Sequence, residues 1–293
     1  MGNVSNLNLN YDRPVKIAED TYWIGFYDKV SGLHCNPYLI VDGDEAVVID
    51  GGSRPDFPIV MMKILQAGVL PSSIKALIYQ HYDPDLCGSI PNFEDIIGQD
   101  NIMLISDREN HMFIRHYYVS NSTFYALEDV NFEYTFSSGR KLQFINTPYA
   151  HSQGSFITFD TRSGVLFSSD LFGSYSVEWE LFLKLDIGCR SCAILHDCPK
   201  GKKTCPIEDI MKFHRVIMTS DRALKYALEK IVNIPFNIIA PQHGSIIHYT
   251  EDIINVFQRL AALEGVGVDS YLVGRPFVDM GNVSALIRRL RPE

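Results

Sequence analysis

The feature that most constrains this chain is a charged cluster directly after an apolar, β-prone run. The run covers residues 74–79 and predicts a buried strand, and His81, Asp83 and Asp85 follow it at alternating positions. Pro84 disfavours a helical conformation at Asp83, so the backbone is expected to stay extended. In α/β proteins, ligands bind at the carboxyl ends of such strands. One imidazole and two carboxylates offer nitrogen and oxygen ligands that suit iron, manganese or zinc.

A metal site is one of two interpretations, because a His and two Asp in a polar loop often serve as turn and capping residues. Three later residues favour the metal site. His151, Asp170 and His243 each stand at or just beyond the end of another strand-like run. These runs cover residues 142–148, 165–169 and 236–240. Four strand ends that carry three His and three Asp predict a site for two metal ions.

These residues resemble the motifs of the metallo-β-lactamase superfamily, and within it those of the di-iron domain of flavodiiron proteins. That domain carries H-x-E-x-D-H, followed by a single His, an Asp and a final His before Gly. Here the first motif reads His81-x-Asp83-x-Asp85-Leu86. The zinc hydrolases carry H-x-H-x-D-H, so the carboxylate at position 83 is the iron-type feature. The resemblance covers roughly residues 14–262, with similar segments at 21–25, 36–41, 49–52, 169–173 and 240–244.

The resemblance implies an α/β fold, the metallo-β-lactamase-like αββα sandwich of two packed sheets. It also implies a centre of two iron ions. Carried over position by position, the ligands are His81, Asp83 and His151 on one iron, Asp85 and His243 on the other, and Asp170 as the bridge. A homodimer is a further expectation by resemblance.

The chain departs from the family pattern at three points. Asp83 replaces the usual Glu, a shorter side chain that can still bind iron. Leu86 replaces the second His of the first motif, and Leu cannot bind a metal. The second iron would then have two terminal protein ligands plus the shared carboxylate, beside an apolar neighbour. No flavodoxin domain follows, so the chain has no FMN site of that type.

Three functions are consistent with this pattern. The first is a non-haem di-iron protein that binds and activates O2, an oxygen sensor or carrier that forms an oxygen adduct, similar to the stand-alone oxygen-binding di-iron proteins of anaerobes. The second is an O2 or NO reductase that receives electrons from a separate flavodoxin or rubredoxin, since flavodiiron proteins reduce these gases with electrons from FMN. The third is a zinc-dependent hydrolase. Whether the chain is an enzyme, and which electron-transfer or signalling protein it meets, stays open.

Composition indicates one globular α/β domain over residues 1–293. The chain has 46% hydrophobic residues and a net charge of −9. No basic run supplies charge for phosphate groups, which disfavours nucleic acid as a partner. No secretory signal is visible at the N-terminus, and no stretch approaches the ~20 apolar residues of a membrane span. We therefore expect a cytoplasmic protein without a membrane partner.

A Cys-rich insertion at about residues 186–206 interrupts this domain and holds four of the six cysteines. These are Cys189, Cys192, Cys198 and Cys205, with His196 nearby as a substitute ligand. Clustered thiols in the cytoplasm indicate a metal or redox group, so zinc or an iron–sulfur cluster is one hypothesis. A reducible disulfide or loop thiols are the alternative. Cys35 and Cys87 are isolated, and Cys87 is expected to be a small packing residue.

Other predictions concern the neighbourhood of the site and the helices. Asp50 ends a strand before two glycines and is expected to orient a metal-bound His through its ring N–H, or else to be a turn residue. Apolar spacing predicts helices over residues 55–67, 207–232 and 251–263, with a break at 219–221. The first helix is expected to bury Ile59, Met62 and Leu65 together with Val60 and Ile64.

Overall fold

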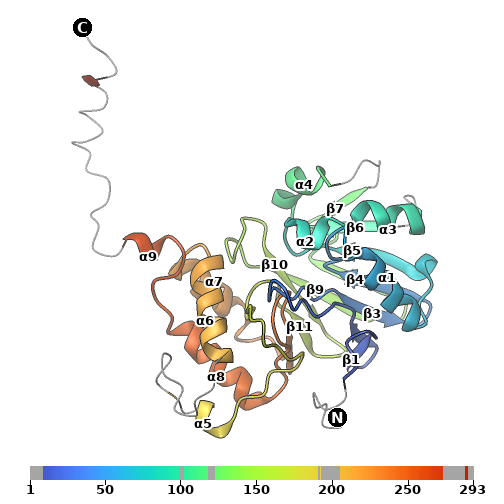
Figure 1. Ribbon diagram of the computed structural model, residues 1–293. Coiled ribbons are helices and arrows are strands. Elements are labelled where there is room, and N and C mark those ends of the chain that lie inside the picture. The colour runs from blue at the N-terminus through green and yellow to red at the C-terminus, as the bar shows by residue number, and fades with distance from the viewer. Residues whose placement is uncertain are drawn as a thin grey trace.

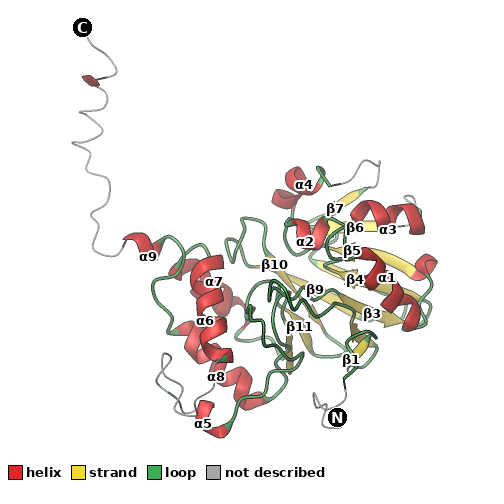
Figure 2. Ribbon diagram, viewed as in Figure 1, coloured by secondary structure: helices red, strands yellow, loops and turns green. Residues whose placement is uncertain are grey.

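Two β-sheets pack face to face, and helices cover the outer face of each (Figures 1 and 2). The computed structural model describes residues 9–98, 102–117, 123–190, 192, 205–272 and 288–289. This arrangement is the metallo-β-lactamase-like αββα sandwich, so the predicted fold class is confirmed. Among the described helices, no segment is both long and apolar enough to span a membrane.

The first sheet has seven strands in chain order, antiparallel from β1 to β4 and parallel from β4 to β7. Its strands are β1 (Val15–Ala18), β2 (Thr21–Trp23), β3 (Tyr38–Asp42), β4 (Glu45–Ile49), β5 (Ile74–Ile78), β6 (Met103–Ser106) and β7 (Phe124–Ala126). The outer face carries α1 (Phe57–Gln66), the 3-10 turn η1 (Pro71–Ser73), α2 (Pro84–Cys87), α3 (Ile90–Ile97) and α4 (Arg108–Ile114). The helix predicted over residues 55–67 is confirmed, because α1 covers Phe57–Gln66.

The second sheet has five strands in the order β12-β11-β10-β9-β8, with β11 and β12 parallel. They are β8 (Glu133–Thr135), β9 (Lys141–Asn146), β10 (Phe156–Asp160), β11 (Val165–Phe167) and β12 (Ile238–Ala240). The helices of this half are α5 (Ile187–Arg190), α6 (Pro206–Ile217), α7 (Asp221–Ile231), α8 (Thr250–Ala261) and α9 (Asp269–Leu272). The break predicted at 219–221 is confirmed, because Ser220 caps α7 by accepting a hydrogen bond from the N–H of Ala223 at 3.1 Å.

Alternation along the strands produces three apolar layers. In β4, Val47 and Ile49 face the central layer between the sheets, whereas Ala46 and Val48 face the helices of the first half. A strand buried on both faces reads as a continuous apolar run, as β4 does. A third layer lies under α6, α7 and α8.

The apolar face predicted for α1 is only partly right. Val60, Met61 and Ile64 are buried, but Ile59, Met62 and Leu65 are 38%, 41% and 50% exposed. Two overlapping sets of apolar residues at helical spacing occur in this helix. Its packing against the sheet, which local periodicity does not reveal, decides which set is covered.

Polar contacts join the two sheets at both ends. At one end, the Arg140 guanidinium is buried against Asp160 and also donates to the backbone O of Val41 at 3.0 Å. At the other, Gln80 follows β5 and donates through Nε2 to the backbone O atoms of Phe156 and Phe167 at 3.1 and 2.8 Å. The Gln80 contacts hold the end of β5 against β10 and β11, where the candidate site lies.

Candidate metal centre

The six residues predicted as ligands lie together at one edge of the sandwich, although they are spread over 163 positions from His81 to His243. They form two groups. In the first group, His151 Nε2 lies 3.0 Å and His81 Nε2 lies 3.8 Å from Asp83 Oδ2. These three atoms come from the end of β5 and from the turn after β9. The first group is therefore His81, Asp83 and His151.

The second group contains a residue that the sequence analysis did not connect to the site. His243 Nε2 lies 3.2 Å from Asp85 Oδ2, and Cys35 Sγ lies 3.6 Å from the same oxygen. The second group is therefore Cys35, Asp85 and His243. A single Cys between short strands carries no motif, and only its pairing with the segment around His243 reveals it.

Asp170 lies between the two groups. Its Oδ2 is 3.9 Å from His151 Nε2, and its Oδ1 is 3.7 Å from His243 Nε2. Asp170 Oδ1 is buried and has no hydrogen-bond partner, although burying an unpaired carboxylate oxygen is costly. A carboxylate with one oxygen toward each group has the position of a bridging ligand.

The spacing of these atoms fits metal ions. Ligand atoms bound about 2.0–2.3 Å from one ion lie roughly 3.0–3.7 Å from each other. The separations of 3.0 Å in the first group and of 3.2 and 3.6 Å in the second fall in this range, and the 3.8 Å between His81 Nε2 and Asp83 Oδ2 lies just above it. The mixture of imidazole, carboxylate and thiol is a donor set for iron, manganese, cobalt or zinc.

The local structure of the first motif differs from the predicted extended segment. Asp83 is extended, with φ −68° and ψ 152°, but α2 begins at Pro84. Pro fits the first turn of a helix, where no N–H is needed, so it ends the extended segment rather than prolonging it. Asp85 therefore projects from a helical turn and reaches the second group, while Asp83 stays with the first.

Leu86, next on α2, is fully buried and belongs to the apolar layer beneath α1 and α3. Cys87 lies in the same layer, as predicted for a packing residue, and its Sγ contacts the backbone O of His81 at 3.5 Å. The side chain at position 86 thus has an apolar packing role in this chain.

A neighbour holds the second ring nitrogen of two of the three candidate ligand His residues. His81 Nδ1 lies 3.0 Å from Ser169 Oγ, and His243 Nδ1 lies 3.2 Å from the backbone O of His34. Such contacts select the tautomer and orient the ring, which leaves Nε2 free for a metal. The hydroxyl of Ser169 was not predicted, because a Ser at the end of a strand has no distinctive pattern.

Asp50 does not have the contact expected of it. Its Oδ1 accepts the backbone N–H of Gln80 at 3.0 Å, and no hydrogen bond joins it to an imidazole of the described residues. The reason is backbone geometry, since Asp50 has φ +55° and its side chain turns toward the end of β5. Burial raises the pKa of Asp50 well above its ordinary range. Asp50 therefore fixes the backbone of Gln80, the residue before His81, and does not orient an imidazole ring.

Electrostatics determine which groups carry protons before metal binds. Burial opposes protonation of His151, but the hydrogen bond to Asp83 and the charge of Asp170 outweigh it and raise its pKa to about 9. Burial also opposes protonation of His243, but hydrogen bonds with Asp85 and Cys35 raise its pKa well above the ordinary value. Burial lowers the pKa of His81. A metal ion must therefore displace protons from His151 and His243 near neutral pH.

Residues with strained backbone angles also lie at this edge of the sandwich. His151 has φ +96° and Ser169 has φ +53°, a region that non-glycine residues rarely adopt. Strain of this kind persists where the surrounding structure enforces it, and it is concentrated at functional sites.

The Cys-rich insertion is not part of this centre. Cys189 and Cys205 are half-buried against the layer under α6–α8, and the described thiols form no candidate metal group with Cys192. Cys198 and His196 lie outside the described residues. Zinc or an iron–sulfur cluster at these cysteines is not supported.

Comparisons with known proteins agree with the fold. The chain is 26% identical over 260 residues to the type A flavoprotein fprA of Rhodobacter capsulatus, which covers 84% of this chain and 55% of that protein. It spans little more than half the length of this curated relative.

Solved structures are similar over most of the chain. The chemotaxis sensor ODP, as a peroxy diiron species, is 24% identical with a TM-score of 0.68, over 87% of this chain and 96% of that one. Its apo state from T. denticola is 23% identical with the same TM-score, over 87% and 95%. Rubredoxin oxygen:oxidoreductase of Desulfovibrio gigas is 17% identical with a TM-score of 0.69, over 85% and 61%. At these identities the likeness shows a shared fold.

One family model, described as "ODP family beta lactamase", matches residues 33–244. The matched segment is most of the chain and contains Cys35 together with all six predicted ligands, from His81 to His243. On this match, and on the fold and motifs described above, the chain belongs to the ODP family of β-lactamase-like domains.

Proposed function

We propose that this protein is a non-haem di-iron protein that binds O2 as an oxygen sensor or carrier. The observation that carries the proposal is the position of Asp170, whose two carboxylate oxygens lie 3.9 and 3.7 Å from His151 and His243 in separate groups. A single metal would not require a buried carboxylate between two sets of ligands. Family membership and the likeness to the chemotaxis sensor ODP, which has been solved as a peroxy diiron species, support the choice of iron and of O2.

The chain's own residues would build the site as follows. His81, Asp83 and His151 would hold one iron, Asp85 and His243 would hold the other, and Asp170 would be shared between them. A pair of ferrous ions supplies electrons and open coordination positions for O2. Three carboxylates offset most of the charge of two divalent ions, and the neutral imidazoles bind through Nε2. Burial of His81, Asp170 and His243 keeps bulk water from the inner side of the site.

A second candidate is an O2 or NO reductase that receives electrons from a separate protein. A row of aromatic contacts connects the surface with the second group. Tyr27 lies 5.4 Å from Trp179, Trp179 stacks on His34 at 4.4 Å, and the backbone O of His34 accepts the hydrogen bond from His243.

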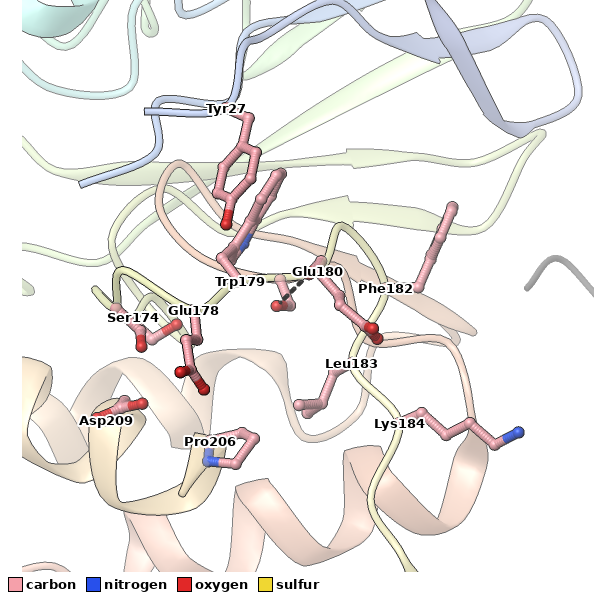
Figure 3. Close-up of a pocket in the computed structure, with 12 residues that line it drawn as sticks. Tyr27, Ser174, Glu178, Trp179, Glu180, Phe182, Leu183, Lys184, Pro206 and Asp209 are labelled. Carbon is pink, nitrogen blue, oxygen red and sulfur yellow. Dashed lines mark hydrogen bonds between the residues drawn. The ribbon is translucent and has the colours of Figure 1, made fainter. Parts of the chain in front are cut away.

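Tyr27 and Trp179 of this row line a cavity of about 600 Å³. Figure 3 shows Tyr27 and Trp179 on one side of it, with Pro206 and Asp209 of α6 on the other. A cavity that opens beside this aromatic row is a suitable place for a redox partner to contact the chain.

An anaerobic titration tests the proposal. The metal-free protein is loaded with ferrous iron, the iron per chain is counted, and air-saturated buffer is added while the visible spectrum is followed. Two irons per chain and a long-lived absorption change support a sensor or carrier. Two irons with rapid decay, and turnover when reduced rubredoxin or flavodoxin is added, support the reductase. Selective binding of zinc with no response to oxygen would contradict both and favour the hydrolase.

A further inference from the structure

We propose that Cys35 binds the second metal as a thiolate, in place of the imidazole that Leu86 cannot supply. The inference deepens the di-metal function proposed above and depends on it. In the flavodiiron motif that the first motif resembles, position 86 carries a His, whereas here Leu86 packs in an apolar layer. Without another ligand, the second group would have only Asp85 and His243 besides the bridging Asp170.

The geometry of Cys35 supports direct binding. Its Sγ is 3.6 Å from Asp85 Oδ2, and it shares a hydrogen bond with His243. The ligand atoms of Cys35, Asp85 and His243 all lie within 4.8 Å of one another. Two atoms bound about 2.0–2.3 Å from one ion are at most roughly 4.6 Å apart. The separations of 3.2 and 3.6 Å from Asp85 Oδ2 to His243 Nε2 and Cys35 Sγ are well inside that limit.

The backbone of Cys35 is fixed beside His243. The two residues form an antiparallel bridge, and the N–H of Asn36 donates to the O of Gln242 at 2.8 Å. The Asn36 amide donates to the backbone O of Gly244 at 2.8 Å and accepts from Trp23 Nε1 at 2.8 Å. A ligand held in this way needs little reorganisation when metal binds.

Close packing behind Cys35 also restricts its position. A Cβ atom on Gly25 would lie 2.4 Å from the backbone O of Cys35, closer than any real contact. Glycine at position 25 therefore permits the two backbone segments to approach closely.

The surroundings of Cys35 differ from those of an ordinary buried cysteine. A buried free Cys usually packs as a small apolar residue. Cys87 does so, because it belongs to the apolar layer beneath α1 and α3. Cys35 is also buried, with 5% exposure, but it belongs to none of the three apolar layers, and its Sγ faces a carboxylate and an imidazole. Cys87 is therefore the matched control for Cys35.

Binding of Cys35 has two consequences. The thiol proton passes to solvent when the metal binds, so loading releases one proton that a variant without this thiol does not release. The second metal also gains an anionic sulfur ligand, whereas the first metal has only nitrogen and oxygen ligands. The two metals of the centre are therefore chemically unequal.

Cobalt(II) provides a test that does not depend on oxygen reactivity. The full-length metal-free protein and its Cys35→Ser, Cys35→Ala and Cys87→Ser variants are loaded with cobalt under anaerobic conditions, and circular dichroism checks their folding. We expect two cobalt ions per parent chain and a near-ultraviolet thiolate-to-cobalt charge-transfer band. The band should disappear in both Cys35 variants and persist in Cys87→Ser. Affinity of the second site should fall about 10- to 100-fold in the Cys35 variants.

The outcomes separate this inference from the function on which it depends. Two cobalt ions per parent chain, with a difference spectrum between parent and Cys35→Ser that lacks the band, would overturn the Cys35 ligand and leave the di-metal centre intact. Fewer than two cobalt ions in the folded parent protein would overturn the centre and the Cys35 ligand with it. Loss of the band in Cys87→Ser, with the band of Cys35→Ser unchanged, would assign the thiolate to Cys87 and overturn the Cys35 ligand.

Discussion

The two ligand groups of the candidate centre differ in burial and in composition. In the first group, the side chains of Asp83 and His151 are 32% and 21% exposed. In the second, Cys35 and His243 are almost fully buried, and only Asp85 retains appreciable exposure, at 26%. Two residues of the first group thus reach solvent, whereas His81 is buried at 1% exposure, and the group contains the residues typical of an iron site. The second lies deeper, lacks the expected imidazole and has a thiol nearby. The sequence motif does not distinguish the two groups, but the fold gives them different burial and different ligand atoms.

The largest expected effect comes from removing the residue that joins the groups. Asp170→Ala should abolish the coupled pair and lower the affinity for the second metal more than about 100-fold, because both metals lose a carboxylate ligand. Metal counting and isothermal titration measure this. Asp44→Ala, in the exposed β3–β4 turn, is the control and should bind two ions. Two full equivalents of iron in the Asp170→Ala variant would contradict the bridging position.

The proton on His151 predicts how the first group responds to pH. The pKa of His151 is raised to about 9 by Asp83 and Asp170 despite burial, so below that pH a metal must displace its proton. Affinity of the first site should therefore rise about tenfold per pH unit from pH 7 to 9 and level off above it. Competition with a chelator, corrected for its own protonation, measures the slope. A flat profile over this range would mean that His151 is neutral in the metal-free protein.

The apolar surroundings of Leu86 predict a cost in stability. Leu86→His buries a polar ring in the layer beneath α1 and α3 and should lower the free energy of unfolding of the metal-free protein by about 2–3 kcal/mol. Leu86→Met, which keeps volume and polarity, should cost less than about 1.5 kcal/mol. Urea denaturation measures both. The prediction is wrong if metal-free Leu86→His is as stable as the parent and metal stabilises it more than the parent. The side chain at position 86 would then reach the second metal.

The smallest effect concerns ring orientation in the first group. Ser169→Ala removes the hydroxyl 3.0 Å from His81 Nδ1 and should weaken the first site about tenfold without changing the number of metals bound. Ser168→Ala is the control, because its Oγ donates to the backbone O of Leu171 and contacts no ligand. Equal weakening in both variants would indicate a general packing effect. The second group has no equivalent variant, since His243 is oriented by a backbone oxygen.

Several errors of the sequence analysis have a common origin. Asp85 was expected on extended backbone but lies on α2. Of the two roles left open for Asp50, a contact with an imidazole or a turn position, it has the turn position and accepts the N–H of Gln80. Ile59, Met62 and Leu65 were expected to be buried but are exposed. In each case the direction in which the side chain points depends on backbone angles or packing partners, and a local sequence pattern does not contain these.

The sequence by itself determined the fold class and which strand ends carry the six candidate metal ligands. This was possible because apolar runs reveal buried strands, and the residues just beyond them lie at the sheet edge. Only the tertiary structure decided how those residues divide into two groups, that Leu86 faces an apolar layer, and that Cys35 lies beside His243. Cys35 and His243 are 208 positions apart and meet through pairing of backbone segments, a contact that no periodicity in the chain encodes.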